Sequence, residues 1–588
     1  MPVSVTDQYR QARDVLLAHR TDIETARANF HWPRFEFFNF ALDWFDQVAA
    51  SEVRGDQEAL VILEEDGSRY STTYAELSAR SAQVANWLRD LGVQRGDGLL
   101  VMLDNQYELW ETMLAGIKLG AVLLPTTVML APEQLQERIE RAEARWVVTN
   151  PANTQKFDAV SGNFTVITTS TDTLPHDAVH PQQLYRDSLQ ASTDFRAIEP
   201  TPADDIALIY FTSGTTSRSK MVAHTHTSYA VGHLSTVYWL GLEPGDKHLN
   251  VASPGWAKHA WSNFFAPLIG EATIFLYNYA RFDAAQLMRV MDAEQVTSIC
   301  APPTVWRMLI QADLNQMTTP PTKVLAAGEP LNPVVIDAVK KAWNADIRDG
   351  FGQTETTLQI ANTPGQNVKP GSLGRVLPGY DVVLIDPATD EVVEGPGEGE
   401  VCLVTEPRPV GLMAGYHNDP DKNAAAFAGG YYRTGDIMER DADGIYTYVG
   451  RADDVFKASD YRLSPFELES VIIEHPAVSE AAVVPSPDPL RLSVPKAYVV
   501  LADGHAPDAN TAKDIFAFTA KKLPPYAKIR RLEFAELPKT ISGKIRRVEL
   551  RNKEHDFHGP DGERTAEALA SRTTTGGYNH EFSAADFN

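Results

Sequence analysis

Short apolar runs alternate with amphipathic stretches between about residues 60 and 350 of this chain. The run ALVILEE is followed by YAELSARSAQVANWLRDLG, and the succession continues with GDGLLVML, LWETMLAGIKLG and AVLLPTT. The apolar runs are typical of buried strands, and the amphipathic stretches are typical of surface helices. Their alternation predicts a parallel sheet covered by helices, which is an α/β fold.

The pattern changes twice further along the chain. Between about 370 and 450, short strands such as GEGEVCLV are separated by Gly and Pro, which predicts a distorted β-barrel. After the GRADD sequence at 450–454, the segments PFELESVIIEHPAV, EAAVVPS and KAYVVLA and a helix near 512–522 predict a compact α+β unit. The residues after about His555 lack a periodic apolar face, so we expect a flexible tail or docking arm there.

A chain of 588 residues exceeds what one hydrophobic core usually supports. We therefore expect a large N-terminal domain of stacked α/β sheets plus the distorted β-barrel, followed by a small mobile α+β domain. The predicted bounds are 1–452 for the large domain, 453–554 for the small domain and 555–588 for the tail.

Charge and hydropathy exclude two classes of partner. The formal net charge is -25, whereas a sequence-independent grip on nucleic acid or on an anionic membrane needs basic surface. No stretch approaches the roughly 20 apolar residues of a membrane-spanning helix. Any phosphate-bearing ligand must therefore find a locally positive site.

The two cysteines, Cys300 and Cys402, each lie inside an apolar run. This placement suits buried, reduced thiols in a reducing compartment. The first thirty residues contain acidic side chains and no long apolar core, so we read no signal or transit peptide there. The sequence thus predicts a cytoplasmic location.

A loop rich in hydroxyl groups follows the apolar strand 206–211. Backbone N–H groups, hydroxyl donors and one cation together can hold a triphosphate. The loop is not a Walker A sequence, because its second glycine is missing and Met221 follows the lysine. The residues expected to bind the phosphates are Thr212, Ser213, Gly214, Thr215, Thr216 and Lys220.

This segment closely resembles the signature of the adenylate-forming superfamily, which includes acyl-CoA synthetases, luciferases and peptide-synthetase adenylation domains. Ser217 and Ser219 stand where that family usually has Gly and Pro, a change in loop stiffness more than in chemistry. Further motifs follow in the family's order over nearly the whole chain. The resemblance implies a large adenylation domain and a small mobile domain.

Two further motifs would contact the nucleotide. In DGFGQTE, Phe351 offers an aromatic face to the base and Glu355 offers a hard oxygen ligand to a divalent ion. The resemblance implies that Thr354 touches the α-phosphate and that the AAGEP turn lies against the adenine, although either motif alone could be a simple turn. The remaining residues assigned to nucleotide binding here are Gly328, Glu329, Asp349, Gly352 and Gln353.

The C-terminal motifs complete the resemblance. YRTGD resembles the family's ribose clamp, with Asp436 as the carboxylate and Arg451 as a second ribose contact. Asp453 matches the hinge about which the small domain rotates. In PKTISGKIR, Lys544 matches the catalytic lysine whose ammonium would bridge the substrate carboxylate and the α-phosphate.

The second half-reaction of the family uses another face of the small domain. Lys457 matches the residue that acts after domain rotation, and Arg462 matches an arginine near the phosphate. Asp460 departs from the family, which commonly has glycine beside the pantetheine channel. Its carboxylate could shift the loop, favour another thiol acceptor or be tolerated.

Extended stretches such as APPTVWRMLIQADL and EPRPVGLMAGYHNDPDKNAAAF resemble the medium-chain acyl-CoA synthetase branch, with benzoate-CoA ligases slightly less similar. The expected pocket residues are Trp256 and Ala327. Lys258 and His259 stand where many relatives have apolar residues. They could meet a polar substituent of the acid, contact pantetheine, or be exposed on a helix.

The sequence therefore predicts an AMP-forming ligase that converts a medium-chain fatty or aromatic acid, ATP and coenzyme A into acyl-CoA, with Mg²⁺ at Glu355. One alternative is an acyl-adenylate synthetase that loads a separate carrier protein. Another is a non-catalytic nucleotide-binding scaffold, which would have no need for Lys220, Glu355, Asp436 and Lys544 together. The oligomeric state stays open, a homo-oligomer included.

Overall fold

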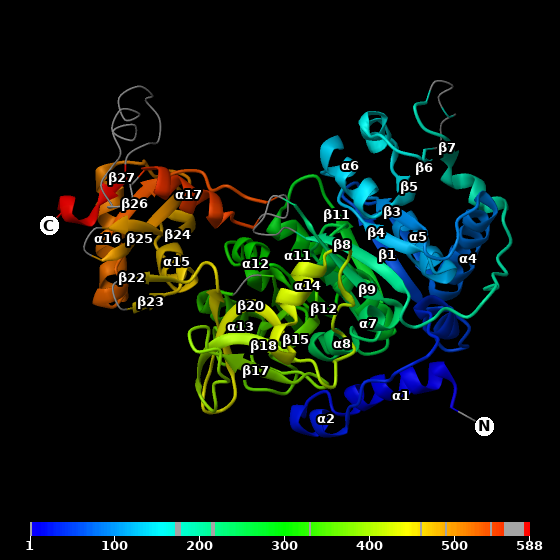
Figure 1. The fold of residues 1–588 in the computed structure, drawn as a ribbon, viewed down its shortest axis with the longest axis horizontal. Coiled ribbons are helices and arrows are strands. Elements are labelled where there is room, and N and C mark those ends of the chain that lie inside the picture. Colours follow the sequence, from blue (N-terminus) through cyan, green and yellow to red (C-terminus); the bar gives the residue numbers. More distant parts are fainter. Residues whose placement is uncertain are drawn as a thin grey trace. The chain divides into compact units, whose positions relative to one another are not determined.

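The computed structural model describes residues 3–170, 174, 178–212, 218–328, 331–458, 461–488, 491–540, 544–557 and 581–587. Its internal contacts divide the chain into two compact units (Figure 1). The first unit comprises 1–382, 403–432 and 444–446, and the second comprises 383–402, 433–443 and 447–588. This division assigns part of the predicted β-barrel to the second unit, and the domain boundary at 452/453 stays a prediction.

A nine-stranded sheet forms one layer of the first unit. Its centre is parallel from β1 to β14, and antiparallel strands lie at both edges. In spatial order the strands are β16 (Arg375–Val376), β15 (Thr357–Ala361), β14 (Arg348–Gln353), β13 (Lys323–Ala327), β12 (Ser298–Ala301), β10 (Lys247–Asn250), β11 (Thr273–Asn278), β1 (Glu58–Glu64) and β2 (Arg69–Thr73).

A second sheet of the first unit has eight strands, again parallel at its centre with antiparallel strands at one edge. In spatial order they are β19 (Gly415–Tyr416), β9 (Lys220–Thr225), β8 (Ile206–Thr212), β4 (Val122–Pro125), β3 (Gly98–Met102), β5 (Ala144–Thr149), β6 (Thr165–Thr168) and β7 (Gln182–Leu184). The predicted parallel α/β arrangement is confirmed.

Helices connect these strands. The α-helices of the first unit are α1 (Val5–Ala18), α2 (Ile23–Asn29), α3 (Asp46–Ala49), α4 (Tyr74–Leu91), α5 (Tyr107–Leu119), α6 (Pro132–Arg141), α7 (His226–Ala230), α8 (Leu234–Leu240), α9 (Ala257–Ala260), α10 (Ala266–Ile269), α11 (Ala284–Ala293), α12 (Pro303–Leu309), α13 (Pro333–Trp343) and α14 (Pro420–Ala426). Shorter 3₁₀ or π segments are η1 (Phe40–Phe45), η2 (Pro151–Ala159), η3 (Tyr185–Gln190), η4 (Trp261–Phe265), η5 (Leu314–Gln316) and η6 (Ala428–Gly430).

Local sequence explains where α4 begins and ends. Thr73 accepts a hydrogen bond from the backbone of Glu76, whose carboxylate accepts one from the backbone of Thr73. This capping box satisfies two of the N–H groups that a helix start leaves unpaired. Gly92 ends the helix in the left-handed conformation, with φ 106°.

The second unit contains smaller sheets. The segment predicted as a barrel contributes the four-stranded order β17 (Val382–Ile385), β18 (Gly397–Val404), β20 (Tyr431–Arg440) and β21 (Tyr446–Arg451). The predicted α+β segment is confirmed. Its elements are β22 (Phe456–Ala458), β23 (Tyr461–Leu463), α15 (Pro465–Ile473), β24 (Val478–Asp488), β25 (Leu492–Leu501), α16 (Ala509–Lys522), η7 (Pro525–Ala527), β26 (Arg531–Phe534), α17 (Arg547–Phe557), β27 (Glu581–Ser583) and η8 (Ala584–Phe587).

The expectation of a flexible tail is corrected where the structure describes it. Residues 555–557 complete α17, and β27 pairs antiparallel with β26 at the edge of the β24–β27 sheet. Phe582 and Phe587 pack on the apolar core of this sheet. Burial of their rings stabilises the segment, although its weak periodicity gives no sign of a strand. Residues 558–580 and 588 lie outside the described residues.

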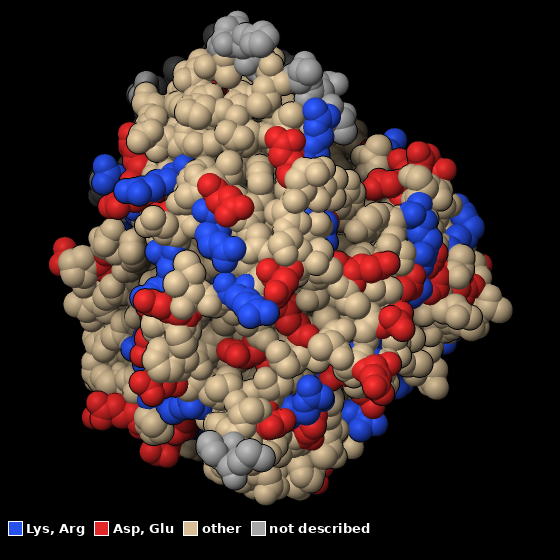
Figure 2. Space-filling view, turned by 90° about the vertical axis from the view of Figure 1, so that its right-hand side faces the viewer, with Lys and Arg blue, Asp and Glu red and all other residues tan. Residues whose placement is uncertain are grey.

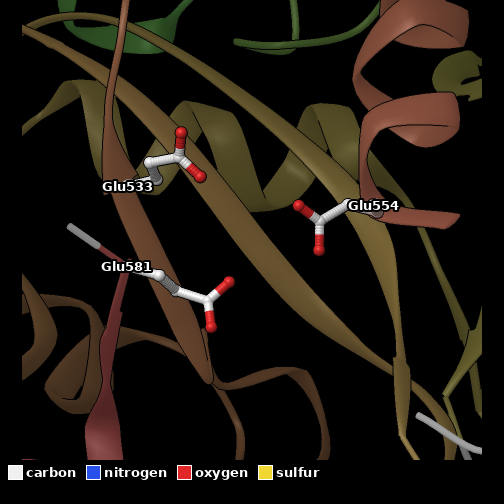
Figure 3. A group of neighbouring side chains, drawn as sticks. All are labelled: Glu533, Glu554 and Glu581. Carbon is white, nitrogen blue, oxygen red and sulfur yellow. The ribbon is translucent and has the colours of Figure 1, made fainter. Parts of the chain in front are cut away.

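Glu581 of β27 enters a buried group of charges with Glu533 and Glu554 (Figure 3). The three carboxylates lie close enough to hold a metal ion, but the ammonium of Lys496 lies 2.8 Å from Glu533, 2.5 Å from Glu554 and 2.8 Å from Glu581. Burial by itself would lower the pKa of Lys496, and the three glutamates raise it to about 12. The cation that balances these carboxylates is therefore a lysine.

The surface carries both signs of charge (Figure 2), and both cysteines are buried. On the face shown in Figure 2, acidic and basic side chains are intermingled. Cys300 and Cys402 are buried and free, as predicted. Within the described ranges, no helix is long and apolar enough to cross a membrane.

The core beneath the nine-stranded sheet yields a stability prediction. Trp306 of α12 is fully buried, donates its indole N–H to the Leu325 carbonyl at 3.0 Å and packs edge-on against Trp343. Trp306→Ala should lower the free energy of unfolding by about 3 to 5 kcal/mol because it leaves a cavity in a close-packed core. Denaturant unfolding would measure this, with Met308→Ala on the exposed face of α12 as the control. Equal effects of the two substitutions would contradict the prediction.

Candidate active site

Strands β8 and β9 hold the two ends of the predicted phosphate loop opposite each other. Thr212 is the last residue of β8, and it pairs with Lys220, the first residue of β9. An apolar strand pair of this kind fixes the two ends of a polar loop. The loop residues Ser213, Gly214, Thr215 and Thr216 lie outside the described residues.

Lys220 and Glu355 are connected through a residue that sequence reasoning missed. The ammonium of Lys220 donates to the hydroxyl of Tyr416 at 3.4 Å and lies 5.1 Å from the centre of its ring. The same hydroxyl donates to the buried Glu355 carboxylate at 3.0 Å. Tyr416 belongs to the quoted stretch EPRPVGLMAGYHNDPDKNAAAF, but nothing in that string shows which loop it faces. The hydroxyl thus connects a cation to a carboxylate that are 135 residues apart in sequence.

A buried histidine fixes the backbone at Thr354. His224 of β9 donates its Nε2–H to the Thr354 carbonyl at 2.7 Å, and its Nδ1 lies 2.9 Å from the Ser228 hydroxyl. Burial lowers the pKa of His224 to about 3, so the ring is neutral at physiological pH. This is the second residue that the sequence analysis did not identify. Its role here is to position the turn after β14.

The turn itself needs a glycine. A Cβ at Gly352 would lie 2.0 Å from the Thr357 carbonyl oxygen, at the irregularity between β14 and β15. Phe351, immediately before it, is half-buried. The side-chain oxygen of Gln353 accepts a hydrogen bond from Tyr432 at 2.8 Å. Because the backbone of Thr357 approaches so closely, the middle residue of the FGQ sequence, Gly352, has no room for a side chain.

Asp349 and the turn after β13 lie at the same edge of the nine-stranded sheet. Ala327 ends β13, and Gly328 follows with φ 112°, a conformation that favours glycine. The buried Asp349 carboxylate accepts from the backbone N–H of Leu331 at 3.2 Å and of Gly350 at 2.8 Å. Burial raises the pKa of Asp349 to about 7. Glu329 lies outside the described residues.

A small apolar cavity borders Trp256. It measures about 20 Å³ and lies between α5, the end of β4, and the α9–η4 segment. Of the two unusual polar residues nearby, His259 is buried beside the cavity and hydrogen-bonds to Asn105 at 3.0 Å, so the exposed interpretation is wrong for it. The lining includes Trp110, Met113, Pro125, Tyr210, Trp256 and Phe264.

The predicted ribose-clamp residues contact each other within the second unit. The buried Asp436 carboxylate accepts from the Tyr448 hydroxyl at 3.0 Å and from Arg451 at 3.2 Å. Arg451 also contacts the Thr434 carbonyl at 3.1 Å and the Asp453 carboxylate at 3.4 Å. These hydrogen bonds fix the orientation of the carboxylate.

The remaining second-unit residues are exposed. Lys457 and Arg462 oppose each other in the β22–β23 hairpin, and Arg462 lies 3.7 Å from Glu398. Lys544 is exposed; its backbone carbonyl accepts from the Thr540 N–H at 2.8 Å, and its backbone N–H donates to the Thr540 hydroxyl at 3.1 Å. Asp460 lies outside the described residues. The structure thus groups Thr212, Lys220, Trp256, Ala327, Gly328, Asp349, Phe351, Gly352, Gln353, Thr354 and Glu355 in the first unit, and Asp436, Arg451, Asp453, Lys457, Arg462 and Lys544 in the second.

The raised pKa of Asp349 predicts a pH-dependent stability. An unfolded aspartate titrates near ~3.9, so above that pH the folded state holds a proton that the unfolded state has lost. Folding therefore weakens by about 1.4 kcal/mol per pH unit as pH rises from about 4 to about 7. Asp349→Asn should remove this loss, so its stability relative to wild type should rise over that range. Unfolding series at several pH values would measure it, with the exposed Asp337→Asn as the control; parallel curves for the two variants would contradict it.

Comparison with known proteins agrees with this arrangement. Residues 46–417 match the family model of the AMP-binding enzyme, and residues 467–544 match that of the AMP-binding enzyme C-terminal domain. The chain is 40% identical to 4-hydroxybutyrate--CoA ligase 1 of Metallosphaera sedula, over 88% of this chain and 91% of that protein. It is 34% identical to the mitochondrial acyl-coenzyme A synthetase ACSM3 of Mus musculus, over 93% and 96% of the two chains.

A solved structure shares the fold as well. The benzoate CoA ligase from Burkholderia xenovorans LB400 is similar with a TM-score of 0.73 at 28% identity, covering 87% of this chain and 100% of that one. The resemblance inferred from the motifs and the predicted fold class are therefore confirmed. The chain belongs to the AMP-binding enzyme family, as an ATP-dependent, AMP-forming acyl-CoA ligase.

Proposed function

We propose that this ligase activates a medium-chain, hydroxylated or aromatic carboxylic acid as its acyl-adenylate and transfers the acyl group to coenzyme A. The observation that carries the proposal is the connection of Lys220 to Glu355 through Tyr416. It places a cation and a hard carboxylate at the end of the phosphate loop. The relatives named for 4-hydroxybutyrate and benzoate support an acid of this size range.

In the first half-reaction, Lys220 and the hydroxyl-rich loop would hold the triphosphate. Thr354, positioned by His224, would contact the α-phosphate. The Glu355 carboxylate fits a Mg²⁺ ion because it is a hard oxygen ligand whose orientation is fixed by a hydrogen bond from Tyr416. When bound, Mg²⁺ supplies positive charge that offsets the phosphate charges.

The adenine and the ribose would each have their own contacting residues. Phe351 would offer its ring to the adenine, and the Gly328 turn would leave room for the base. Asp436 would accept hydrogen bonds from both ribose hydroxyls, and Arg451 would support it from the side. The existing Asp436–Arg451 contact favours this role because it holds the carboxylate in one orientation.

Two exposed lysines of the second unit would act in turn. Lys544 would bridge the acid carboxylate and the α-phosphate during adenylation, where its charge offsets the repulsion between two anions. After rotation about Asp453, Lys457 and Arg462 would face the adenylate for thioester formation. The exposure of Lys457 and Lys544 suits side chains that must engage a ligand in only one of two conformations.

The acid would lie beside Trp256 and Ala327. The cavity bordering Trp256 is lined mainly by apolar side chains, which favours an acid with an alkyl or aryl body.

We also propose a reducing compartment such as the cytoplasm, because the two thiols are buried and free.

The lysine assignment yields a test of the proposed function. Lys544→Ala should lower acid-dependent ATP–pyrophosphate exchange by at least a hundredfold yet spare thioester formation from supplied acyl-adenylate. Lys457→Ala should do the reverse. Lys539→Ala is the matched control, since Lys539 is a neighbouring residue whose ammonium is paired with Glu480. AMP release without thioester in the wild-type enzyme would contradict the ligase proposal, as would equal loss of both steps in both variants.

The hydroxyl of Tyr416 yields a second test. Tyr416→Phe removes the hydrogen bond to Glu355 while keeping the ring beneath Lys220, so the carboxylate should lose its fixed orientation. We expect the Mg²⁺ concentration for half-maximal activity to rise roughly tenfold. Titration of activity with Mg²⁺ would measure this, with Tyr526→Phe, an exposed tyrosine, as the control. An unchanged Mg²⁺ dependence would remove Tyr416 from this role.

A further inference from the structure

Lys258 lies two residues after Trp256, on α9, in a setting that is unusual for a lysine. Its side chain is half-buried, and its ammonium donates to the Asn250 side-chain oxygen at 3.1 Å and to the Cys300 sulfur at 2.9 Å. Neither acceptor carries a charge, and no carboxylate lies within ion-pair distance among the described residues. A lysine held in this way by neutral groups needs another explanation than a surface ion pair.

The ammonium lies at the edge of the sheet where ligands of parallel sheets bind. Asn250 is the last residue of β10, and Cys300 is its register partner on β12. The next two strands, β13 and β14, end at Ala327 and Gln353. In open α/β sheets, ligands bind outside the carboxyl ends of the strands. Lys258 therefore lies at the same sheet edge as the residues proposed to meet the acid and the adenine.

Two hydrogen-bond donors in this position are available to a ligand. A lysine ammonium has three N–H groups, and Asn250 and Cys300 accept two of them. The amide nitrogen of Asn250, whose side chain is 2% exposed, has no hydrogen-bond partner among the described residues. Buried donors are almost always satisfied in proteins, so a missing acceptor points to a bound molecule or an ordered water. The donors Lys258 Nζ and Asn250 Nδ2 would both contact the same acceptor.

The electrostatics of the site favour a neutral acceptor. The ammonium of Lys258 is one charge in a half-buried setting, and its two partners, Asn250 and Cys300, are neutral. A carboxylate on the ligand would have to leave water for this buried setting beside apolar side chains, and the desolvation cost of a buried ion pair can exceed its attraction. A hydroxyl, ether or carbonyl oxygen accepts hydrogen bonds without this cost.

We propose that Lys258 and Asn250 determine the acid specificity of this ligase by binding a neutral oxygen substituent on the acid, as in an ω-hydroxy acid. The proposal rests on the proposed function. Apolar surfaces beside Trp256 contact the alkyl portion, and the two donors select the oxygen at its end. A site built to hydrogen-bond an oxygen rejects an analogue that lacks it, because its polar groups are then left unpaired.

The test compares acids of equal length in the first half-reaction. ATP–pyrophosphate exchange is measured without coenzyme A for 4-hydroxybutyrate, pentanoate and glutarate, which carry a hydroxyl, a methyl and a carboxylate at the same end. We expect the wild-type enzyme to show kcat/KM at least tenfold higher for the hydroxy acid than for either other acid. Lys258→Met, which keeps the side-chain length, should lower the ratio of hydroxy acid to pentanoate at least tenfold.

The matched control is Lys247→Met at the opposite end of β10, where the ammonium is paired with Glu294 at 3.1 Å. It should leave the ratio unchanged. Thermal unfolding checks that each variant folds, and if Lys258→Met does not fold, Lys258→Gln tests the same ratio with a shorter, uncharged donor and should give at least a threefold decrease.

The outcomes separate the two proposals. An unchanged ratio in the Lys258 variant, a wild-type preference for glutarate, or an effect confined to the KM of coenzyme A would each overturn the specificity inference. The last of these would assign Lys258 to pantetheine. Absence of exchange with every acid in the wild-type enzyme would overturn the proposed function itself, and the inference with it.

Discussion

The hydroxyl of Tyr416 lies between the ammonium of Lys220 and the carboxylate of Glu355, and this contact orients both charged groups of the candidate site. It joins an antiparallel edge strand of one sheet to the turn that follows β14 of the other. A hydrogen bond to an ionised group is roughly twice as strong as one between neutral groups. The contact therefore holds the edge strand β19 and the turn after β14 in one arrangement.

Around that contact, a neutral side chain fixes the backbone, and the charged side chains remain available to bind ligands. His224 is buried and neutral, and it holds the Thr354 carbonyl without adding a charge to the site. In the second unit, Asp436 is paired with Arg451 at 3.2 Å. The overall charge of -25 makes this local arrangement necessary, because nothing in the average surface attracts a nucleotide. Binding of ATP must come from a few placed cations.

The sequence was sufficient for the elements that rest on local pattern. The alternation of apolar runs with amphipathic helices predicted β1, α4, β3, α5 and β4 in order, because each element's burial repeats within a few residues. The motif residues could be named because their motifs resemble those of the adenylate-forming superfamily. Their grouping on strand ends follows from the parallel sheet, whose strands all end at one edge.

Contacts between distant segments could not be predicted in the same way. Tyr416 and His224 carry no local signal, since a tyrosine or histidine in a strand is usually part of the core. The β27 strand was missed because three residues are too short to show periodicity, and its stability comes from Phe582 and from the Glu581–Lys496 pair. Such contacts exist only once the chain has folded.

The short helix α9 shows why an acid of mixed polarity suits this site. His259 and Ala260 border the apolar cavity together with Trp256, whereas Lys258 contacts Asn250 and Cys300 at the carboxyl ends of β10 and β12. A purely apolar acid would leave the Asn250 amide unsatisfied, and a dicarboxylic acid would bring a second ionised group into a buried, largely apolar setting. An acid with an apolar body and one neutral oxygen fits both surfaces. The residues of α9 can therefore distinguish this acid from a purely apolar acid and from a dicarboxylic acid.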